Sequence, residues 1–286
     1  MRIAKISNDY GTFAVRGFVM INLDDLIEQE IENGYGDMNA RAKVCQDLIL
    51  KSISSGRLSK NVTIKGGVVM REKTKNIRRA TQDIDIDFIR YSIQDESIDK
   101  FIKTLNCLDG IKIVRKGDIE ALKQQDYKGK RVFIEISDSF GNKIPSKIDF
   151  GVHNKLNIEQ EEFCFDIAFD DEGASLLINT NEQMFTEKLR SLLRLGSVST
   201  RFKDIFDMYY LCKKIDKKRL FICMDTYIYQ DSEMRENDIQ GVLKRIRRTF
   251  DDEKYLERLN NSDKKWLDVD VREVVKELLN FLKKCK

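Results

Sequence analysis

The sequence predicts an α/β N-terminal half, a mixed sheet with helices over residues 1–180, followed by an all-helical half over residues 181–286. Two observations predict this division into two domains. Short β-rich runs alternate with helical patterns before residue 180, whereas almost every later segment has apolar residues at helical spacing. The charge balance also changes, from 27 Lys/Arg against 29 Asp/Glu (−2) in the first half to 24 against 19 (+5) in the second. We expect the functional site in the cleft between the two domains.

The N-terminal half shows its elements through caps, breaks and alternation. Asn22 is typical of a helix N-cap, with Asp25 three residues later. Apolar residues at 3–4 spacing predict a helix over residues 38–55, another is expected over 95–106, and a short one begins near Val68. We expect strands at residues 61–65, 83–89, 111–115, 131–137, 146–152 and 162–169.

In the C-terminal half, Asn181 is expected to cap the first helix. The predicted helices are 181–195, 200–214, 217–228, 237–249, 252–260 and 270–284. The fourth of them carries the basic cluster Lys244-Arg245-Ile246-Arg247-Arg248, which either binds RNA phosphates through its charge or forms a solvated helix face. The positive balance of this half indicates an anionic partner.

Composition excludes several classes of protein. An apolar content of 41% and a net charge of +3 do not fit a disordered chain or a polybasic DNA-coating protein. His153 is the only histidine, which excludes His-rich zinc sites, and no GxSxG motif accompanies it. None of the six cysteines forms a CxxC pair, so a structural zinc site or a redox motif is not expected. Because the N-terminus lacks an apolar targeting region and no run approaches about 18 apolar residues, we expect a cytoplasmic protein with no membrane segment.

The strongest local signal is the run Asp83-Ile84-Asp85-Ile86-Asp87. Strand alternation places its three carboxylates on one face, where they repel one another unless a cation or basic groups lie nearby. Carboxylate and phosphate oxygens are the ligands that Mg²⁺ prefers. The alternative is an edge strand with a solvated acidic face. Asp149 alternates in the same way within residues 146–152, and it is either a third site carboxylate or a simple outward-facing strand residue.

Gly66-Gly67 lies between a strand and a helix, 16 residues before Asp83 (83 − 67). Glycines at a helix N-terminus let backbone N–H groups approach phosphate oxygens closely, although a glycine pair is also an ordinary turn. The segment that follows contains five cations that either hold a triphosphate or a nucleic acid strand or form a solvated loop: Arg71, Lys73, Lys75, Arg78 and Arg79. Strand, glycine pair, helix and Asp-x-Asp strand together predict a phosphate cradle beside a metal-binding carboxylate pair.

Four motifs resemble those of one protein family in order and spacing. They are Lys65-Gly66-Gly67-Val68-Val69-Met70-Arg71, Arg79-Ala80-Thr81-Gln82-Asp83-Ile84-Asp85, Glu187-Lys188-Leu189-Arg190-Ser191-Leu192-Leu193-Arg194 and Arg201-Phe202-Lys203-Asp204-Ile205-Phe206-Asp207-Met208-Tyr209. Together they resemble the AbiEii nucleotidyltransferases, toxins of type IV toxin–antitoxin and phage abortive-infection systems. The resemblance spans about residues 60–215 and departs from the family at Val68, where Ser or Thr is frequent.

The resemblance implies a nucleotidyltransferase-superfamily fold for the α/β domain, with the helical domain completing the active-site cleft. It implies transfer of a nucleoside monophosphate from an NTP to an RNA acceptor, the 3′ end of tRNA, with release of pyrophosphate, in antiviral defence that blocks growth or phage propagation. Mg²⁺ is the implied metal, with Asp83, Asp85 and Asp149 as its ligands. A cognate antitoxin protein is the implied partner.

Site roles follow from the matching positions. Catalytic roles are expected of Asp83, Asp85, Asp149, Lys188 and Asp204. Nucleotide contacts are expected of Lys65, Gly66, Gly67, Arg71, Arg79, Thr81, Lys188 and Asp207. Lys188 lies at the margin of a leucine stripe, where it either reaches triphosphate oxygens or remains a surface lysine. Asp204 and Asp207 share a helix face, where the alternative is a surface ion pair between Arg201 and Asp204.

Two other functions stay open at this point. The enzyme could transfer a nucleotide to a small molecule such as an aminoglycoside. Alternatively, the chain could be a non-catalytic module that binds a nucleotide or a partner protein. The presence of all three carboxylates argues against the non-catalytic module.

Overall fold

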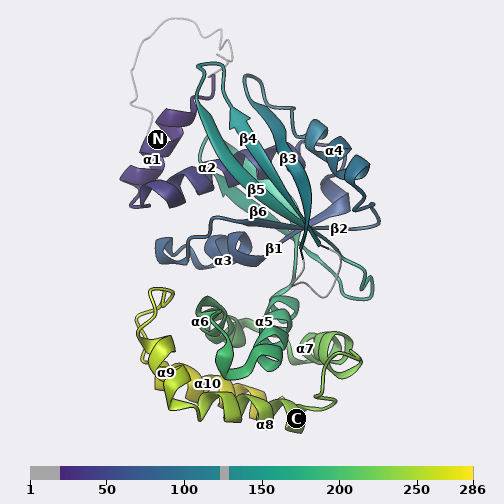
Figure 1. Ribbon diagram of the computed structural model, residues 1–286, viewed down its shortest axis with the longest axis vertical. Coiled ribbons are helices and arrows are strands. Elements are labelled where there is room, and N and C mark those ends of the chain that lie inside the picture. Colours follow the sequence, from purple (N-terminus) through teal and green to yellow (C-terminus); the bar gives the residue numbers. More distant parts are fainter. Residues whose placement is uncertain (1–19, 123–128, 286) are drawn as a thin grey trace, which may run out of the picture.

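The computed structural model describes residues 20–122 and 129–285, and it places an α/β part above a helical part in the view of Figure 1. Within these residues one seven-stranded sheet has the order β3-β4-β5-β2-β1-β7-β6. The strands are β1 (Val62–Lys65), β2 (Ile84–Phe88), β3 (Lys112–Leu122), β4 (Gly129–Ser137), β5 (Lys143–Val152), β6 (Glu161–Ile167) and β7 (Asp170–Ile178). The sheet is mixed, because β2 runs antiparallel to β1 but parallel to β5, and β1 runs parallel to β7.

Helices flank the sheet and then make up the rest of the described chain. The α/β part contains α1 (Leu23–Glu32), α2 (Asp37–Ser54), α3 (Gly66–Thr74) and α4 (Asp95–Thr104), with short 3₁₀ turns η1 (Ser59–Asn61) and η2 (Ile77–Arg79). Described residues after Ile178 form no strand. They form α5 (Asn181–Leu195), η3 (Gly196–Val198), α6 (Phe202–Leu211), η4 (Cys212–Lys214), α7 (Lys217–Met224), the π-helical turn η5 (Asp225–Tyr229), α8 (Ile239–Phe250), α9 (Glu253–Asn260) and α10 (Val271–Lys283).

The two faces of β2 have different surroundings. Ile84, Ile86 and Phe88 are at most 1% exposed and belong to the hydrophobic core. The Phe88 ring packs edge-on against Phe101 of α4, with their centroids 5.2 Å apart. Because side chains alternate along a strand, the aspartates of β2 point to the opposite face.

Most of the expected helices and strands are confirmed. Of the two predicted helix caps, one is confirmed and one is wrong. Oδ1 of Asn22 accepts a hydrogen bond from the Asp24 amide at 3.0 Å, so Asn22 caps α1 as predicted. The cap predicted at Asn181 is wrong. Oγ1 of Thr180 accepts from the Gln183 amide at 3.2 Å, and Asn181 is the first helical residue.

The sequence pattern misses β7 altogether. Its first residues, Asp170-Asp171-Glu172-Gly173, are acidic and contain glycine, which disfavours a strand. Tertiary pairing overrides this preference, because β7 lies between β6 and β1, with Leu177 opposite Thr63. The strand therefore depends on neighbours that are far away in the sequence.

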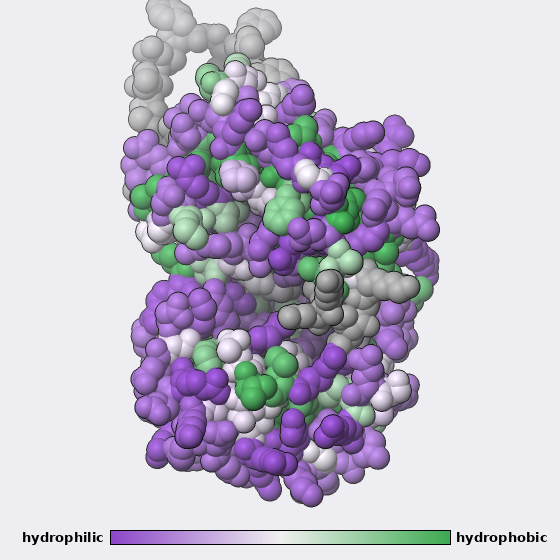
Figure 2. Space-filling model, viewed as in Figure 1, coloured by the Kyte–Doolittle hydropathy of each residue, from purple (hydrophilic) through white to green (hydrophobic). Residues whose placement is uncertain are grey.

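The helical part is attached to the segment between β1 and β2. Lys73 Nζ donates to Oδ1 of Asn181 at 2.7 Å, and the Tyr210 hydroxyl donates to the Lys73 carbonyl at 2.5 Å. Lys203 Nζ donates to the carbonyl of Ala80 at 2.7 Å. These bonds hold α5 and α6 close to β2, and the outline of the molecule narrows where the two parts meet (Figure 2).

The described helices can be compared with the length and apolarity that a membrane-spanning helix needs. Among the residues that the structure describes, none of the helices is both long enough and apolar enough to span a membrane. The N-terminal segment, for which we predicted no apolar targeting region, falls within residues 1–19 and so lies outside the described residues.

Candidate active site

A row of four charged residues crosses the middle of the sheet. The strand registers pair Arg131 of β4 with Asp149 of β5, Asp149 with Asp85 of β2, and Asp85 with Lys65 of β1. Residues directly opposite each other on neighbouring strands project to the same face. The row therefore brings together three residues predicted from the sequence, Lys65, Asp85 and Asp149, and one that was not, Arg131.

Cations hold most of the carboxylates around this row. Nε and Nη2 of Arg131 donate to the two carboxylate oxygens of Asp149 at 2.8 and 2.7 Å. Lys147 Nζ lies 2.9 Å from Oδ1 of Asp83. Lys65 Nζ lies 2.7 Å from Oδ1 of Asp87, which is buried. Like charges are thus separated by basic side chains, as the sequence pattern required.

Asp85 is different from its neighbours. Its carboxylate forms no hydrogen bond or ion pair with another described residue, although it occupies the centre of the row. Burial, together with the nearby carboxylates of Asp149 and Asp83, raises the pKa of Asp85 to about 6, against the opposing effect of Lys65. A cation bound here would relieve both the burial cost and the repulsion.

The first turn of α3 lies directly against this carboxylate. Gly66 has φ +69°, a conformation that favours glycine, and a Cβ atom at this position would lie 2.2 Å from Oδ2 of Asp85. A Cβ atom on Gly67 would lie 2.5 Å from Oγ1 of Thr81. Only glycines allow the helix N-terminus to approach Asp85 and Thr81 so closely. The free backbone amides of this turn can donate hydrogen bonds to a phosphate group beside the aspartates.

A second cluster of charges connects the two parts of the molecule. Arg79 of η2 donates to both oxygens of Asp207 of α6, at 2.6 and 2.7 Å. Lys188 Nζ of α5 lies 2.8 Å from Asp207 Oδ2 and 2.8 Å from Asp204 Oδ1. Arg201 Nε then donates to Oδ2 of Asp204 at 2.6 Å. Positive and negative side chains alternate along this chain of five residues.

The alternation fixes the charge states of the second cluster. Burial would lower the pKa of Lys188, but Asp204 and Asp207 outweigh it and raise this pKa above its ordinary value. Despite burial, Lys188 and Arg201 lower the pKa of Asp204 to about 2. Lys188 is therefore cationic and Asp204 anionic at neutral pH. The carboxylate of Asp85 also raises the pKa of Arg79 and of Arg201, so the second cluster lies within electrostatic reach of the first.

Arg71 and Arg79 differ from the simple expectation of phosphate contacts. The Arg71 side chain is 2% exposed, and its Nε and Nη2 donate to Oε1 of Glu72 at 3.1 and 2.9 Å. A further bond joins Arg71 to Gln46 of α2, so its contacts lie with α2 and with its own helix α3 rather than with the aspartate row. Arg79 is 3% exposed and uses two of its nitrogens to bind Asp207.

The donor set fits Mg²⁺ in chemistry, since Asp83, Asp85 and Asp149 offer carboxylate oxygens on one side of the sheet. In the described ranges, however, no group of three Asp, Glu, His or Cys side chains converges closely enough to hold a metal ion. Asp83 and Asp149 are turned to Lys147 and Arg131 instead. Joint metal ligation by the three aspartates stays a prediction, and it requires these two ion pairs to loosen.

Arg131 and Lys147 are the site residues that sequence reasoning missed. Both lie on strands that were predicted. No local signal joins them to the aspartates. Only the register between β4, β5 and β2 reveals the proximity, and register depends on long-range pairing.

Comparison with known proteins assigns the class. A family model described as nucleotidyl transferase AbiEii toxin, type IV toxin–antitoxin system, matches residues 48–279. The match covers well over half of the chain, so the protein belongs to this family of nucleotidyltransferase toxins, as the motif resemblance predicted. Membership of a type IV toxin–antitoxin family implies an antitoxin partner.

Other comparisons add less. A search of curated proteins finds no match. Among solved structures, the chain is similar to the crystal structure of an antigenic nucleotidyltransferase-like protein from Paracoccidioides brasiliensis. That protein is 13% identical, the likeness covers 76% of this chain and 93% of the other, and the TM-score is 0.44. Such a distant likeness adds nothing to the family assignment.

Proposed function

We propose that the protein transfers a nucleoside monophosphate from an NTP to an RNA acceptor, the 3′ end of tRNA, with Mg²⁺ as the metal and pyrophosphate as the leaving group. The observation that carries the proposal is the carboxylate of Asp85, which has no hydrogen-bond or ion-pair partner among the described residues and touches the glycine turn of α3 at the centre of the charged row. A carboxylate beside free helix amides suits a phosphate group with its cation. The family description supports nucleotidyl transfer.

In this proposal different residues of the chain bind the phosphates, stabilise the leaving group and hold the metal. The backbone amides of Gly66 and Gly67 hold phosphate oxygens of the NTP, and Lys188 adds a positive charge as negative charge develops on the leaving pyrophosphate. Asp204 and Asp207 hold the ammonium of Lys188 in place. Asp83, Asp85 and Asp149 would hold Mg²⁺, which would neutralise the phosphates and make the acceptor hydroxyl easier to deprotonate.

The biological consequence in this proposal is growth arrest. A nucleotide added to the 3′ end of tRNA occupies the terminus that must carry an amino acid. Translation then stops in the cytoplasm, which blocks growth or phage propagation until the antitoxin intervenes. The family description of a toxin supports this outcome.

The decisive test is labelling of the acceptor. The purified protein is incubated with each α-³²P-labelled NTP, Mg²⁺ and total RNA, and the products are separated by size. We expect label in the tRNA band with one preferred NTP, and no label in EDTA or with the Asp83→Asn variant. Label that survives nuclease digestion and travels with a small molecule, such as an aminoglycoside, would replace the RNA acceptor in this proposal. Absence of labelled product with every NTP and acceptor would contradict nucleotidyl transfer itself.

A further inference from the structure

Three cations on the outer face of α8 stand without an acidic partner. The side chains of Lys244, Arg247 and Arg248 are exposed, and none of them forms a hydrogen bond or an ion pair with another described residue. Arg245 of the same cluster behaves differently, because its Nε donates to the carbonyl of Leu193 at 3.2 Å on the inner side of the helix. The basic cluster therefore splits into one packing residue and a free cationic face.

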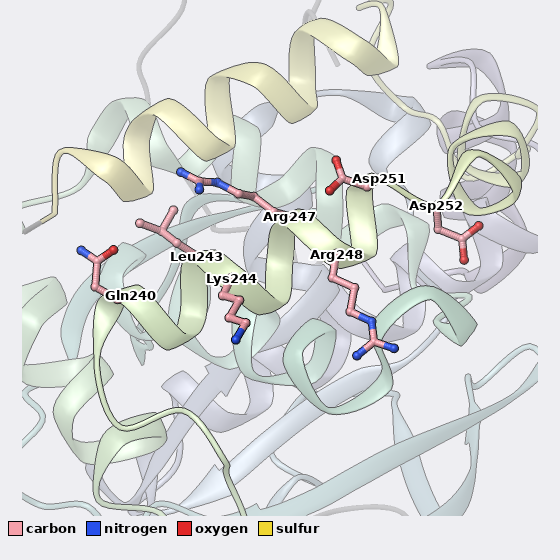
Figure 3. A pocket seen from close by; sticks show the side chains of 7 residues that line it. All are labelled: Gln240, Leu243, Lys244, Arg247, Arg248, Asp251 and Asp252. Atoms are coloured by element: carbon pink, nitrogen blue, oxygen red, sulfur yellow. The ribbon is translucent and has the colours of Figure 1, made fainter.

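This face is hollowed and continuous. A depression of about 620 Å³ is lined by Gln240, Leu243, Lys244, Arg247, Arg248, Asp251 and Asp252. Figure 3 shows Lys244 and Arg248 extending to the same side of the helix, with Arg247 at its other edge. Positions 244 and 248 are about one helical turn apart, so the two backbone positions lie about 6 Å from each other along the axis. Neighbouring phosphates of one nucleic acid strand have a similar spacing.

We propose that this α8 face binds backbone phosphates of the RNA acceptor, an inference that rests on the proposed function. RNA fits the face better than an acidic protein does. Protein interfaces depend on buried aromatic and apolar residues, whereas nucleic acid interfaces are polar and strongly cationic. No large hydrophobic side chain of α8 itself is exposed, so this helix offers a protein partner no apolar anchor.

The helix that carries this face is bonded to α5, the helix that carries Lys188 of the candidate active site. Arg245 binds the Leu193 carbonyl of α5, and a Cβ atom on Gly196 would lie 3.1 Å from its Nη2. Leu193 is five residues from Lys188 on the same helix, about 8 Å along its axis. RNA held on α8 is thus anchored to the element that carries the lysine of the site. The body of the acceptor would be bound at α8 while its end is free to reach the aspartate row.

The expected size of the effect follows from counterion release. Each phosphate neutralised contributes about −0.7 to −0.9 to the slope of log K against log salt concentration. Two to three phosphates bound by the three cations give a slope contribution of about 1.4–2.7. Between 50 and 200 mM salt, the wild type should therefore lose about 7- to 40-fold more RNA affinity than a protein without these charges.

The test compares two matched triple variants of the full chain. The first is Lys244→Gln, Arg247→Gln and Arg248→Gln together. The control is Arg272→Gln, Lys276→Gln and Lys283→Gln on α10, where exposed cations alternate with Glu273 and Glu277. Binding of a fluorescently labelled tRNA pool is measured by anisotropy between 50 and 200 mM KCl, and NTP binding is measured separately by calorimetry.

We expect a shallower salt slope for the α8 variant alone, each single substitution giving about a third of the change, with NTP binding unaltered. A wild-type slope in the α8 variant would overturn the proposal. The proposal would also be overturned if the α8 variant bound RNA as the wild type does but no longer bound polyglutamate. That result would assign the face to an acidic protein. These measurements require no catalysis. The transfer assay could therefore give no labelled RNA while the α8 variant still shows the reduced salt slope. That pair of results would contradict nucleotidyl transfer to RNA but support RNA binding by the α8 face.

Discussion

Gly66 and Asp85 are in contact across the start of α3, so that a Cβ atom on the glycine would lie 2.2 Å from Oδ2 of the aspartate. This proximity joins the two parts of the predicted site, the phosphate cradle and the metal-binding carboxylates, into one place. It also makes the backbone at residue 66 the most sensitive point of the site, because no other residue type has room there.

Replacement of Gly66 by alanine should remove activity beyond its effect on stability. The backbone at φ +69° makes any L-residue strained by about 1–2 kcal/mol, and the added methyl group must push Asp85 aside. Gly117→Ala is a matched control, since Gly117 has φ +66° and a methyl group added to it would meet nothing within 4 Å. Gly117→Ala should show the stability cost of the backbone strain alone, and Gly66→Ala should lose more because of its clash with Asp85. Per folded molecule, only Gly66→Ala should lose at least about 100-fold in nucleotide transfer. Equal activity losses would disconnect Gly66 from the site.

Asp85→Asn should stabilise the protein above pH 6 while it inactivates it. Burial raises the folded-state pKa of Asp85 to about 6 from an ordinary value of 3.8, so ionisation destabilises the native state. This destabilisation by the ionised carboxylate is absent below about pH 4 and complete above the folded pKa. The amide of the Asn variant does not ionise, so the variant does not suffer it. A shift of two units corresponds to at most roughly 3 kcal/mol, and partial exposure to water reduces this to about 1–2 kcal/mol.

Thermal unfolding in EDTA at pH 4 and pH 8 measures this effect. Asp83→Asn is the control, because Asp83 is paired with Lys147 and its amide variant should gain nothing at pH 8. Both variants should lose nucleotide transfer, since each loses a charge needed to hold Mg²⁺. Wild-type transfer by either variant would contradict its assignment as a metal ligand.

The sequence predicted the aspartate strand and the glycine turn because both are local patterns. Alternation places Asp83 and Asp85 on one face, and a strand, a glycine pair, a helix and an Asp-x-Asp strand seldom follow one another by chance. Asp149 was predicted from alternation too, although nothing local states that β5 lies beside β2. The parallel pairing that puts Asp149 opposite Asp85 comes only from the folded sheet.

The long-range features could not be predicted from the sequence. Arg131 reaches Asp149 through the register of two strands, and β7 exists because β1 and β6 hold it on either side. Charge pairing likewise decides where arginines point. Arg71 and Arg79 look alike in the basic segment of the sequence, yet one is directed to Gln46 of α2 and the other to Asp207 of α6.

Arg79 and Asp207 should act as a coupled unit that positions Lys188. Arg79 binds both oxygens of Asp207, whose Oδ2 lies 2.8 Å from the lysine ammonium. Arg79→Gln and Asp207→Asn should each lower the maximal transfer rate, and the double variant should be less impaired than the sum predicts. A coupling free energy of about 0.5–3 kcal/mol is typical of residues in contact. Strict additivity in this double-mutant cycle would show that Arg79 acts on the nucleotide independently.

Expression of the protein without its antitoxin should slow bacterial growth. This prediction follows from the toxin family to which the chain belongs. The catalytic origin of the effect is tested with Asp83→Asn, which should be expressed at the same level and restore growth. Equal toxicity of the two forms would mean that growth arrest does not require nucleotide transfer.

Lys188→Ala and Arg190→Ala separate the site from the structural face of one helix. Lys188 is enclosed by Asp204 and Asp207, whereas Arg190 lies about 200° further around α5. Nε of Arg190 donates to Oδ2 of Asp231 at 3.0 Å, so it ties α5 to the segment after η5. Both variants should lose stability, because each removes a cation that lies between two carboxylates, Asp204 and Asp207 for Lys188 and Asp231 and Glu233 for Arg190.

Their rates per folded molecule should differ. In the proposed reaction Lys188 stabilises charge that grows on the leaving pyrophosphate, so Lys188→Ala should lower the transfer rate at saturating NTP by about 100- to 1,000-fold. Arg190→Ala should transfer nucleotide at nearly the wild-type rate once the folded fraction, measured by circular dichroism, is taken into account. Small and equal rate losses for both variants would leave the triphosphate to the amides of Gly66 and Gly67. Lys188 would then serve only to hold Asp204 and Asp207 together at the junction of the two parts.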